Sequence, residues 1–83
     1  MTTLQELGKA IAQQRKVLKQ RQRIVAAQAG ITAETLSRFE QGRVAEFGTR
    51  KLLAVLAVLG MEMEFSKKGE TGSLDELRKE RRL

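Results

Sequence analysis

Residues 21–42 read RQRIVAAQAGITAETLSRFEQG, and this stretch is the most informative part of the chain about its fold. Val25, Ala26 and Ala29 are spaced as the apolar face of one short helix. Gly30 follows directly and can end that helix, because glycine adopts a positive φ without steric cost. The first half of the stretch therefore predicts a short helix and a tight glycine turn.

The second half of the stretch predicts another short helix. Thr32 is a good N-cap residue, Glu34 suits the positive end of the helix dipole, and Leu36 and Phe39 share an inward face. A helix with short polar groups and one long arginine outside is well shaped for a DNA major groove. A plain helical hairpin in a small bundle fits the turn equally well. The outward residues are Ala33, Glu34, Thr35, Ser37 and Arg38.

The flanking segments predict two longer helices. Thr3 and Glu6 form a capping box, and the helix that follows ends near Lys19. After a loop at residues 42–48, Thr49 is expected to cap a helix that ends at Gly60. Its run from 52 to 59 is apolar all round, so part of it should face a second copy of the chain, unless the tail buries it. The inward residues of the first helix are Leu4, Leu7, Ile11 and Leu18.

Residues 61–66, MEMEFS, alternate between apolar and polar, which is the pattern of a half-buried strand. No other segment has this pattern, so the strand is expected to pair antiparallel with the same segment of a second chain. Residues 61–67 would thus be a dimerisation strand, and 68–83 a linker with a marginal C-terminal helix or a disordered tail. The expected dimer contacts are Leu56, Leu59, Met61, Met63 and Phe65.

The chain has 83 residues and a net charge of +6, which predicts one small basic domain. Residues 1–51 carry ten Lys or Arg and four Asp or Glu, whereas residues 52–83 carry six of each. The excess positive charge brackets the two short helices, as neutralisation of phosphates around a groove requires. A solvated basic face is the alternative interpretation.

The sequence lacks residues and segments that several other classes of protein require. There is no cysteine and no histidine, so disulfides, thiol catalysis and the usual zinc ligands are not expected, and we expect no cofactor or metal. The sequence has no histidine, cysteine or tyrosine to act with the carboxylates of Glu62 and Glu64 in general acid-base chemistry, so an enzyme is a poor interpretation. The longest apolar run is far too short to span a bilayer, and no secretory leader is visible. A soluble cytoplasmic protein is therefore expected.

Several motifs over residues 4–60 resemble the Xre family of regulators, which includes the lambdoid phage repressors and Cro. The matching residues are Gln22, Val25-Ala26, Gly30-Ile31-Thr32, Thr35-Leu36-Ser37 and Glu40-Gln41-Gly42, and Arg15 in the first helix. This resemblance implies a mainly α fold, a four- to five-helix domain over residues 1–60, with one C-terminal strand that pairs across a dimer. It also implies an ion pair between Arg15 and Glu40 across the core.

The resemblance also assigns roles to residues. Bases would be contacted by Ala33, Glu34, Ser37 and Arg38, and phosphates by Gln22, Thr32, Thr35, Arg43 and Arg50. A strand directly after the helical domain is similar to the HipB-like branch, which contains antitoxins that dimerise and repress their own operons. The resemblance thus implies a homodimeric repressor on an inverted-repeat operator in double-stranded DNA, with a toxin as a possible partner. A stand-alone regulator without a toxin and a module that docks an acidic protein are the alternatives.

Overall fold

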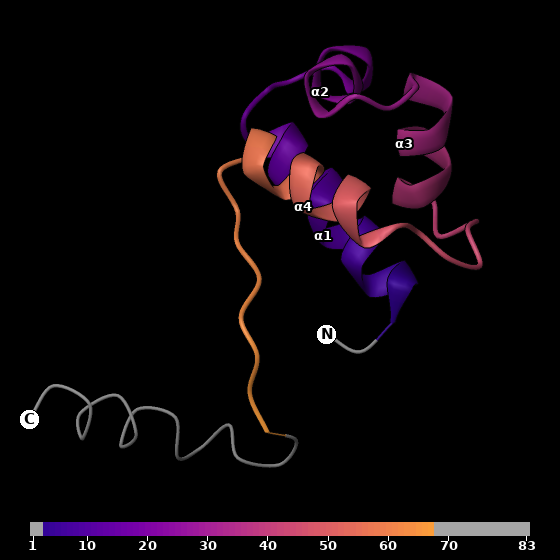
Figure 1. The fold of residues 1–83 in the computed structure, drawn as a ribbon. Coiled ribbons are helices and arrows are strands. Elements are labelled where there is room, and N and C mark those ends of the chain that lie inside the picture. The colour runs from indigo at the N-terminus through magenta and orange to yellow at the C-terminus, as the bar shows by residue number, and fades with distance from the viewer. Residues whose placement is uncertain (1–2, 68–83) are drawn as a thin grey trace, which may run out of the picture.

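The computed structural model describes residues 3–67 and contains four helices in this part of the chain. Figure 1 shows α2 and α3 as a connected pair on one side of α1 and α4. The mainly helical fold is confirmed for the described residues, and none of their helices is long and apolar enough to cross a membrane. The expected linker and C-terminal helix at 68–83 lie outside the described residues. In chain order the helices are α1 (Leu4–Val17), α2 (Gln22–Ala29), α3 (Ala33–Glu40) and α4 (Thr49–Val58).

The start of α1 follows the expected capping pattern. Thr3 is the N-cap, and its hydroxyl oxygen accepts a hydrogen bond of 3.1 Å from the backbone N–H of Glu6. The helix ends at Val17, two residues before Lys19, which has φ of 56°. The inward position expected for Leu18 is wrong, because its side chain is 43% exposed. Leu18 caps the helix and is the first residue outside its regular period, so the spacing rule no longer applies there.

One hydrophobic core connects all four helices. The helix α3 supplies Leu36 and Phe39, which are fully buried as expected. Half-buried side chains from α1, from the loop after α3 and from residues 61–63 pack against this core. A domain of this size depends on such a core, because the apolar area that it can bury is small. The buried apolar residues are Ile11, Val25, Ala26, Leu36, Phe39, Leu52, Val55, Leu56 and Leu59.

The helix α1 approaches α3 closely at Gly8. This glycine is buried, and a Cβ atom added to it would overlap the carbonyl oxygen of Phe39 and lie 3.0 Å from the carbonyl carbon. A side chain of any size at position 8 would therefore push the two helices apart. The absence of a side chain sets the distance between α1 and the last turn of α3.

The helix α4 begins at a different residue from the one expected. The N-cap is Gly48 and makes no side-chain cap bond, so the cap expected from Thr49 is wrong: Thr49 is the first residue of the helix. The regular helix ends at Val58, and Gly60 follows with φ of 68°. One face of α4 is buried in the core, whereas Leu53 on the other face is 50% exposed. The described chain therefore covers only one side of this apolar helix.

Residues 61–67 leave α4 as an extended segment (Figure 1). The backbone N–H of Met61 donates to the carbonyl oxygen of Leu56 at 2.8 Å, which turns the chain after the helix. Within the described residues no strand is present. If the partner strand belongs to a second chain, a single chain cannot form the hydrogen-bond ladder between the two strands. The pairing of residues 61–66 across a dimer therefore stays a prediction.

Candidate functional site

The turn between α2 and α3 has the geometry that its sequence predicts. Gly30 adopts φ of 76° and ψ of 27°, the left-handed conformation, and ends α2. The backbone N–H of Ile31 then donates to the carbonyl oxygen of Ala26 at 2.9 Å, the long bond of a Schellman cap. Three residues, 30–32, thus reverse the chain and fix the angle between the two helices.

Thr32 begins α3 as its N-cap. Its hydroxyl oxygen accepts from the backbone N–H of Thr35 at 3.1 Å, and the hydroxyl donates to the Thr35 hydroxyl at 2.8 Å. Thr32 therefore satisfies an end group of the helix, which would otherwise need another partner. The hydroxyl proton of Thr35 stays available for a ligand, whereas that of Thr32 is already used.

Replacing Thr32 with alanine is expected to lower the free energy of unfolding by about 1 kcal/mol, because the N-cap bond of α3 is lost. Chemical denaturation followed by circular dichroism measures this change. Thr32→Ser is the matched control, since serine keeps the hydroxyl and should retain most of the stability. An alanine variant as stable as the serine variant would contradict the capping role.

The outward face of α3 presents the residues that the sequence assigns to base contacts. Ala33, Glu34 and Arg38 are exposed, while Ser37 is half-buried. The Nε2 group of Gln41 donates to the hydroxyl oxygen of Ser37 at 3.2 Å. Because Leu36 and Phe39 anchor the opposite face in the core, the exposed face has a fixed orientation. The described structure thus offers one short helix edge with a carboxylate, a small side chain and a guanidinium.

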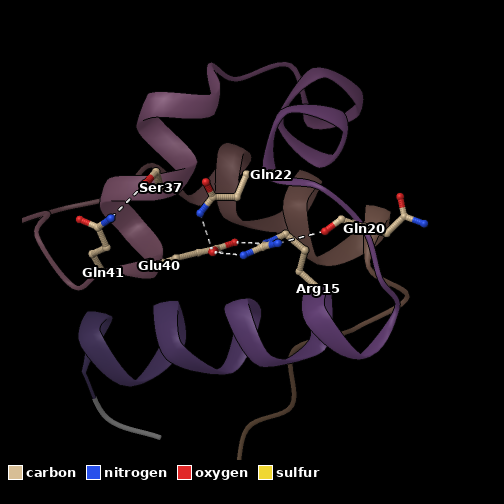
Figure 2. A network of polar contacts seen from close by, with 6 residues as sticks. All are labelled: Arg15, Gln20, Gln22, Ser37, Glu40 and Gln41. Carbon is tan, nitrogen blue, oxygen red and sulfur yellow. Dashed lines mark hydrogen bonds and ion pairs between the residues drawn. The ribbon is translucent and has the colours of Figure 1, made fainter.

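A polar cluster around Glu40 holds α3 to α1 and α2 (Figure 2). The two carboxylate oxygens of Glu40 accept from Nε and one terminal nitrogen of Arg15, both at 2.8 Å. Gln22 donates from Nε2 to the same carboxylate at 2.9 Å. The Arg15 and Glu40 side chains are only 12% and 4% exposed, so this bidentate ion pair is largely shielded from water.

The same cluster fixes the link between α1 and α2. Arg15 donates from its other terminal nitrogen to the carbonyl oxygen of Gln20 at 2.9 Å. The hydrogen bond with Glu40 raises the pKa of Arg15 above its ordinary value, against the opposing effect of burial. Arg15 therefore stays charged throughout the physiological pH range. No buried side-chain nitrogen or oxygen among residues 3–67 lacks a hydrogen-bond partner.

The residues expected at phosphates lie on α2, at the start of α3, in the loop after α3 and on α4. Gln22 opens α2, but one N–H of its amide is already donated to Glu40, which the sequence interpretation did not anticipate. Arg43 lies in the loop after α3 and Arg50 in the first turn of α4, and both are exposed. These cations lie on the segments that follow α3, whereas Arg21 and Arg23, also exposed, lie at the start of α2.

The loop after α3 is anchored by an aromatic pair that sequence reasoning missed. The rings of Phe39 and Phe47 stack with their centroids 4.1 Å apart and an angle of 4° between their planes. Gly42 has φ of 72°, and the N–H of Arg43 donates to the carbonyl oxygen of Arg38 at 2.9 Å. The loop that carries Arg43 is thus tied to α3 at both ends.

The residues expected at a dimer interface fall into two groups. Leu59 is 1% exposed and Leu56 is 7% exposed, so the core of one chain already accounts for their burial. Met61 and Met63 are half-buried against this core, whereas Phe65 is 89% exposed. A second chain could therefore reach the extended segment more readily than Leu59.

The fold and the α2–α3 pair define a helix-turn-helix domain, in which a glycine turn joins two short helices and the second presents an exposed face. The family model described as a helix-turn-helix domain matches residues 3–67, most of the chain. The chain belongs to this helix-turn-helix family, whose architecture is that of DNA-binding regulators. No curated protein matches the sequence.

Proposed function

We propose that the chain is a sequence-specific DNA-binding repressor that acts as a homodimer. The observation that carries this proposal is the exposed face of α3, held rigid by the buried Glu40 cluster and by the cap at Thr32. A recognition helix has to keep its geometry when it enters the DNA major groove, because a small displacement misplaces every base contact. The described domain supplies that rigidity on one side of α3 and exposed polar groups on the other.

The chemistry of this face fits the edges of bases in a major groove. Ala33 is small and lets the start of α3 approach closely, Glu34 can accept from a cytosine amino group, and Arg38 can donate two bonds to a guanine. Ser37 is the fourth candidate for a base contact, although Gln41 already occupies its oxygen. The guanidinium of Arg38 is the strongest of these groups, because a bidentate contact discriminates between bases.

The surrounding cations support contacts with the DNA backbone. Arg43 and Arg50 follow α3, and the hydroxyl of Thr35 and the second amide N–H of Gln22 are further donors; Thr32 acts mainly as a cap. Contacts of this kind position a protein on DNA without specifying its sequence. The net charge of +6 favours binding to a polyanion at low salt.

A homodimer would place two α3 helices in successive major grooves of an inverted repeat, about 34–36 Å apart. Occlusion of a promoter by this dimer would repress transcription. The resemblance to the HipB-like branch supports a role as the antitoxin of a HipBA-like toxin–antitoxin system that represses its own operon in the cytoplasm, with no catalytic activity. A stand-alone Xre-family regulator is the second form of this function.

Arg38→Ala is expected to weaken binding to the preferred sequence by about 1–3 kcal/mol and to relax one base position. Arg43→Ala should instead weaken preferred and random duplexes alike and reduce the salt dependence by about one phosphate contact. Fluorescence anisotropy with both duplexes at several salt concentrations measures these changes.

Equal losses on the two duplexes for Arg38→Ala would contradict its role in base recognition. Arg38→Lys is the matched control, because lysine keeps the charge but lacks the planar guanidinium that can donate two hydrogen bonds to one base. If the wild-type protein shows no preference among duplexes and binds an acidic protein instead, the basic face serves protein docking and the DNA proposal fails.

A further inference from the structure

A groove runs between the first half of α1 and the extended segment after α4. Its volume is about 760 Å³, and its walls come from α1, α4 and residues 61–66. The apolar lining includes Leu4, Leu7 and Ala10 on one side and Met61, Met63 and Phe65 on the other, and Glu62 and Glu64 also line the second side. The described side chains thus leave an apolar surface beside the core that a further apolar side chain can cover.

Phe65 stands at the end of one wall of this groove. In an extended chain alternate residues share a face, so Phe65 lies on the same side as Met61 and Met63. Those two methionines pack against the core, whereas Phe65 is 89% exposed, more than any other large apolar side chain of the described residues. Phe65 is itself one of the residues that line the groove, but it is not among the side chains that pack against the core.

We propose that the groove receives Phe65 of a second copy of the chain, and that each copy fills the groove of the other. This inference rests on the homodimer proposed above and specifies its register. Antiparallel pairing centred on Met63 places Met61 opposite the partner subunit's Phe65. Opposed residues of such a pair have Cβ atoms about 4.5–5.5 Å apart and point to the same face. The partner subunit's Phe65 then lies beside Met61 and above the groove.

Two observations favour a second copy over another occupant. Phe65 is one of the residues that line the groove, so one patch provides both a cavity and a side chain for the cavity of the partner, as a two-fold interface requires. In addition, the backbone groups of Met63 and Phe65 make no hydrogen bond with the rest of the described chain. The same antiparallel pairing would satisfy these groups.

The chain has no cysteine, so disulfide cross-linking between introduced cysteines can test this register. The full chain with Phe65→Cys is mixed with the full chain with Ala10→Cys and oxidised mildly. We expect a disulfide-linked pair of unlike chains, because Ala10 lines the groove that receives residue 65. Ala27→Cys is the matched control: Ala27 is an exposed alanine on α2, which does not line the groove, and should cross-link poorly.

The outcomes separate this inference from the proposed function. Sedimentation equilibrium of the wild-type chain first establishes whether it dimerises, and a monomer overturns both the homodimer and the exchange. If the Phe65→Cys chains form disulfides mainly with one another and not with the Ala10→Cys chains, the proposed register is overturned. A variant with both Phe65→Cys and Ala10→Cys that forms only a disulfide within one chain shows that the segment folds back on its own groove, which also overturns the exchange.

A second variant tests the energy of the contact. Phe65→Ala should weaken dimerisation by at least about a hundredfold, because two phenylalanine side chains lose their burial in each dimer. The fold of the monomer should be retained, since Phe65 contributes nothing to the core. Val17→Ala, at a 73% exposed position on α1, is the control and should leave dimerisation unchanged. Equal dimerisation of the two variants would overturn the proposal.

Discussion

Arg15→Met is expected to destabilise the domain by about 3–5 kcal/mol, because it leaves the carboxylate of Glu40 buried with Gln22 as its remaining partner. A single core of this size rarely provides more than about 3–5 kcal/mol in total. Much of the Arg15→Met protein should therefore be unfolded at 25 °C. Circular dichroism during thermal and urea denaturation measures the folded fraction.

The reverse substitution should cost less. In Glu40→Met the stranded group is Arg15, which is 12% exposed and has a long side chain that can turn toward water. The double variant Arg15→Met/Glu40→Met should recover much of the loss, because no charge then stays buried. A double variant whose loss equals the sum of the two single losses would contradict the coupling between these residues.

Gly8→Ala is expected to lower the free energy of unfolding by about 3 kcal/mol, at the upper end of the usual cost of overpacking. Its Cβ would overlap the carbonyl oxygen of Phe39, a backbone atom that cannot turn aside as a flexible side chain can. The helix propensity of alanine offsets about 1 kcal/mol of a larger steric cost. Since Phe39 precedes Glu40, the displacement would also strain the ion pair. Urea denaturation measures the effect.

Gly48→Ala is the matched control for this glycine. A Cβ at position 48 would meet only Lys51 Cδ, at 4.0 Å, and the backbone there has φ of −58°. This substitution should cost clearly less than Gly8→Ala, since alanine meets no backbone atom here and restricts the unfolded chain, although it is a poorer N-cap residue than glycine. If Gly8→Ala is as stable as Gly48→Ala, the close approach of α1 and α3 does not limit the packing.

The local features of the fold could be predicted from the sequence. The turn at Gly30 and the caps at Thr3 and Thr32 depend on residues within a few positions of one another, and all three are present. The pair of Arg15 and Glu40 is 25 residues apart, and only the resemblance to a family indicated it. Periodicity alone identifies faces of helices but does not identify which faces meet.

Features that depend on packing between distant segments could not be predicted. The sequence alone indicates only that Gly8 lowers the helix propensity of its segment. Its role in the close approach of α1 to α3 is visible only in the structure. Phe47 lies in a loop with no periodic pattern, so its stacking on Phe39 has no local signal. Leu59 was assigned to a dimer interface because α4 is apolar all round, yet the core of a single chain buries it.

Selection from a random duplex library can determine whether α3 reads a specific DNA sequence, as proposed above. The purified chain is incubated with the library near physiological salt, and the bound duplexes are recovered and sequenced over several rounds. We expect enrichment of an inverted repeat whose half-site centres lie about 34–36 Å apart, with one half-site position relaxed in Arg38→Ala. Recovery of unenriched, random sequences by the folded protein would contradict it.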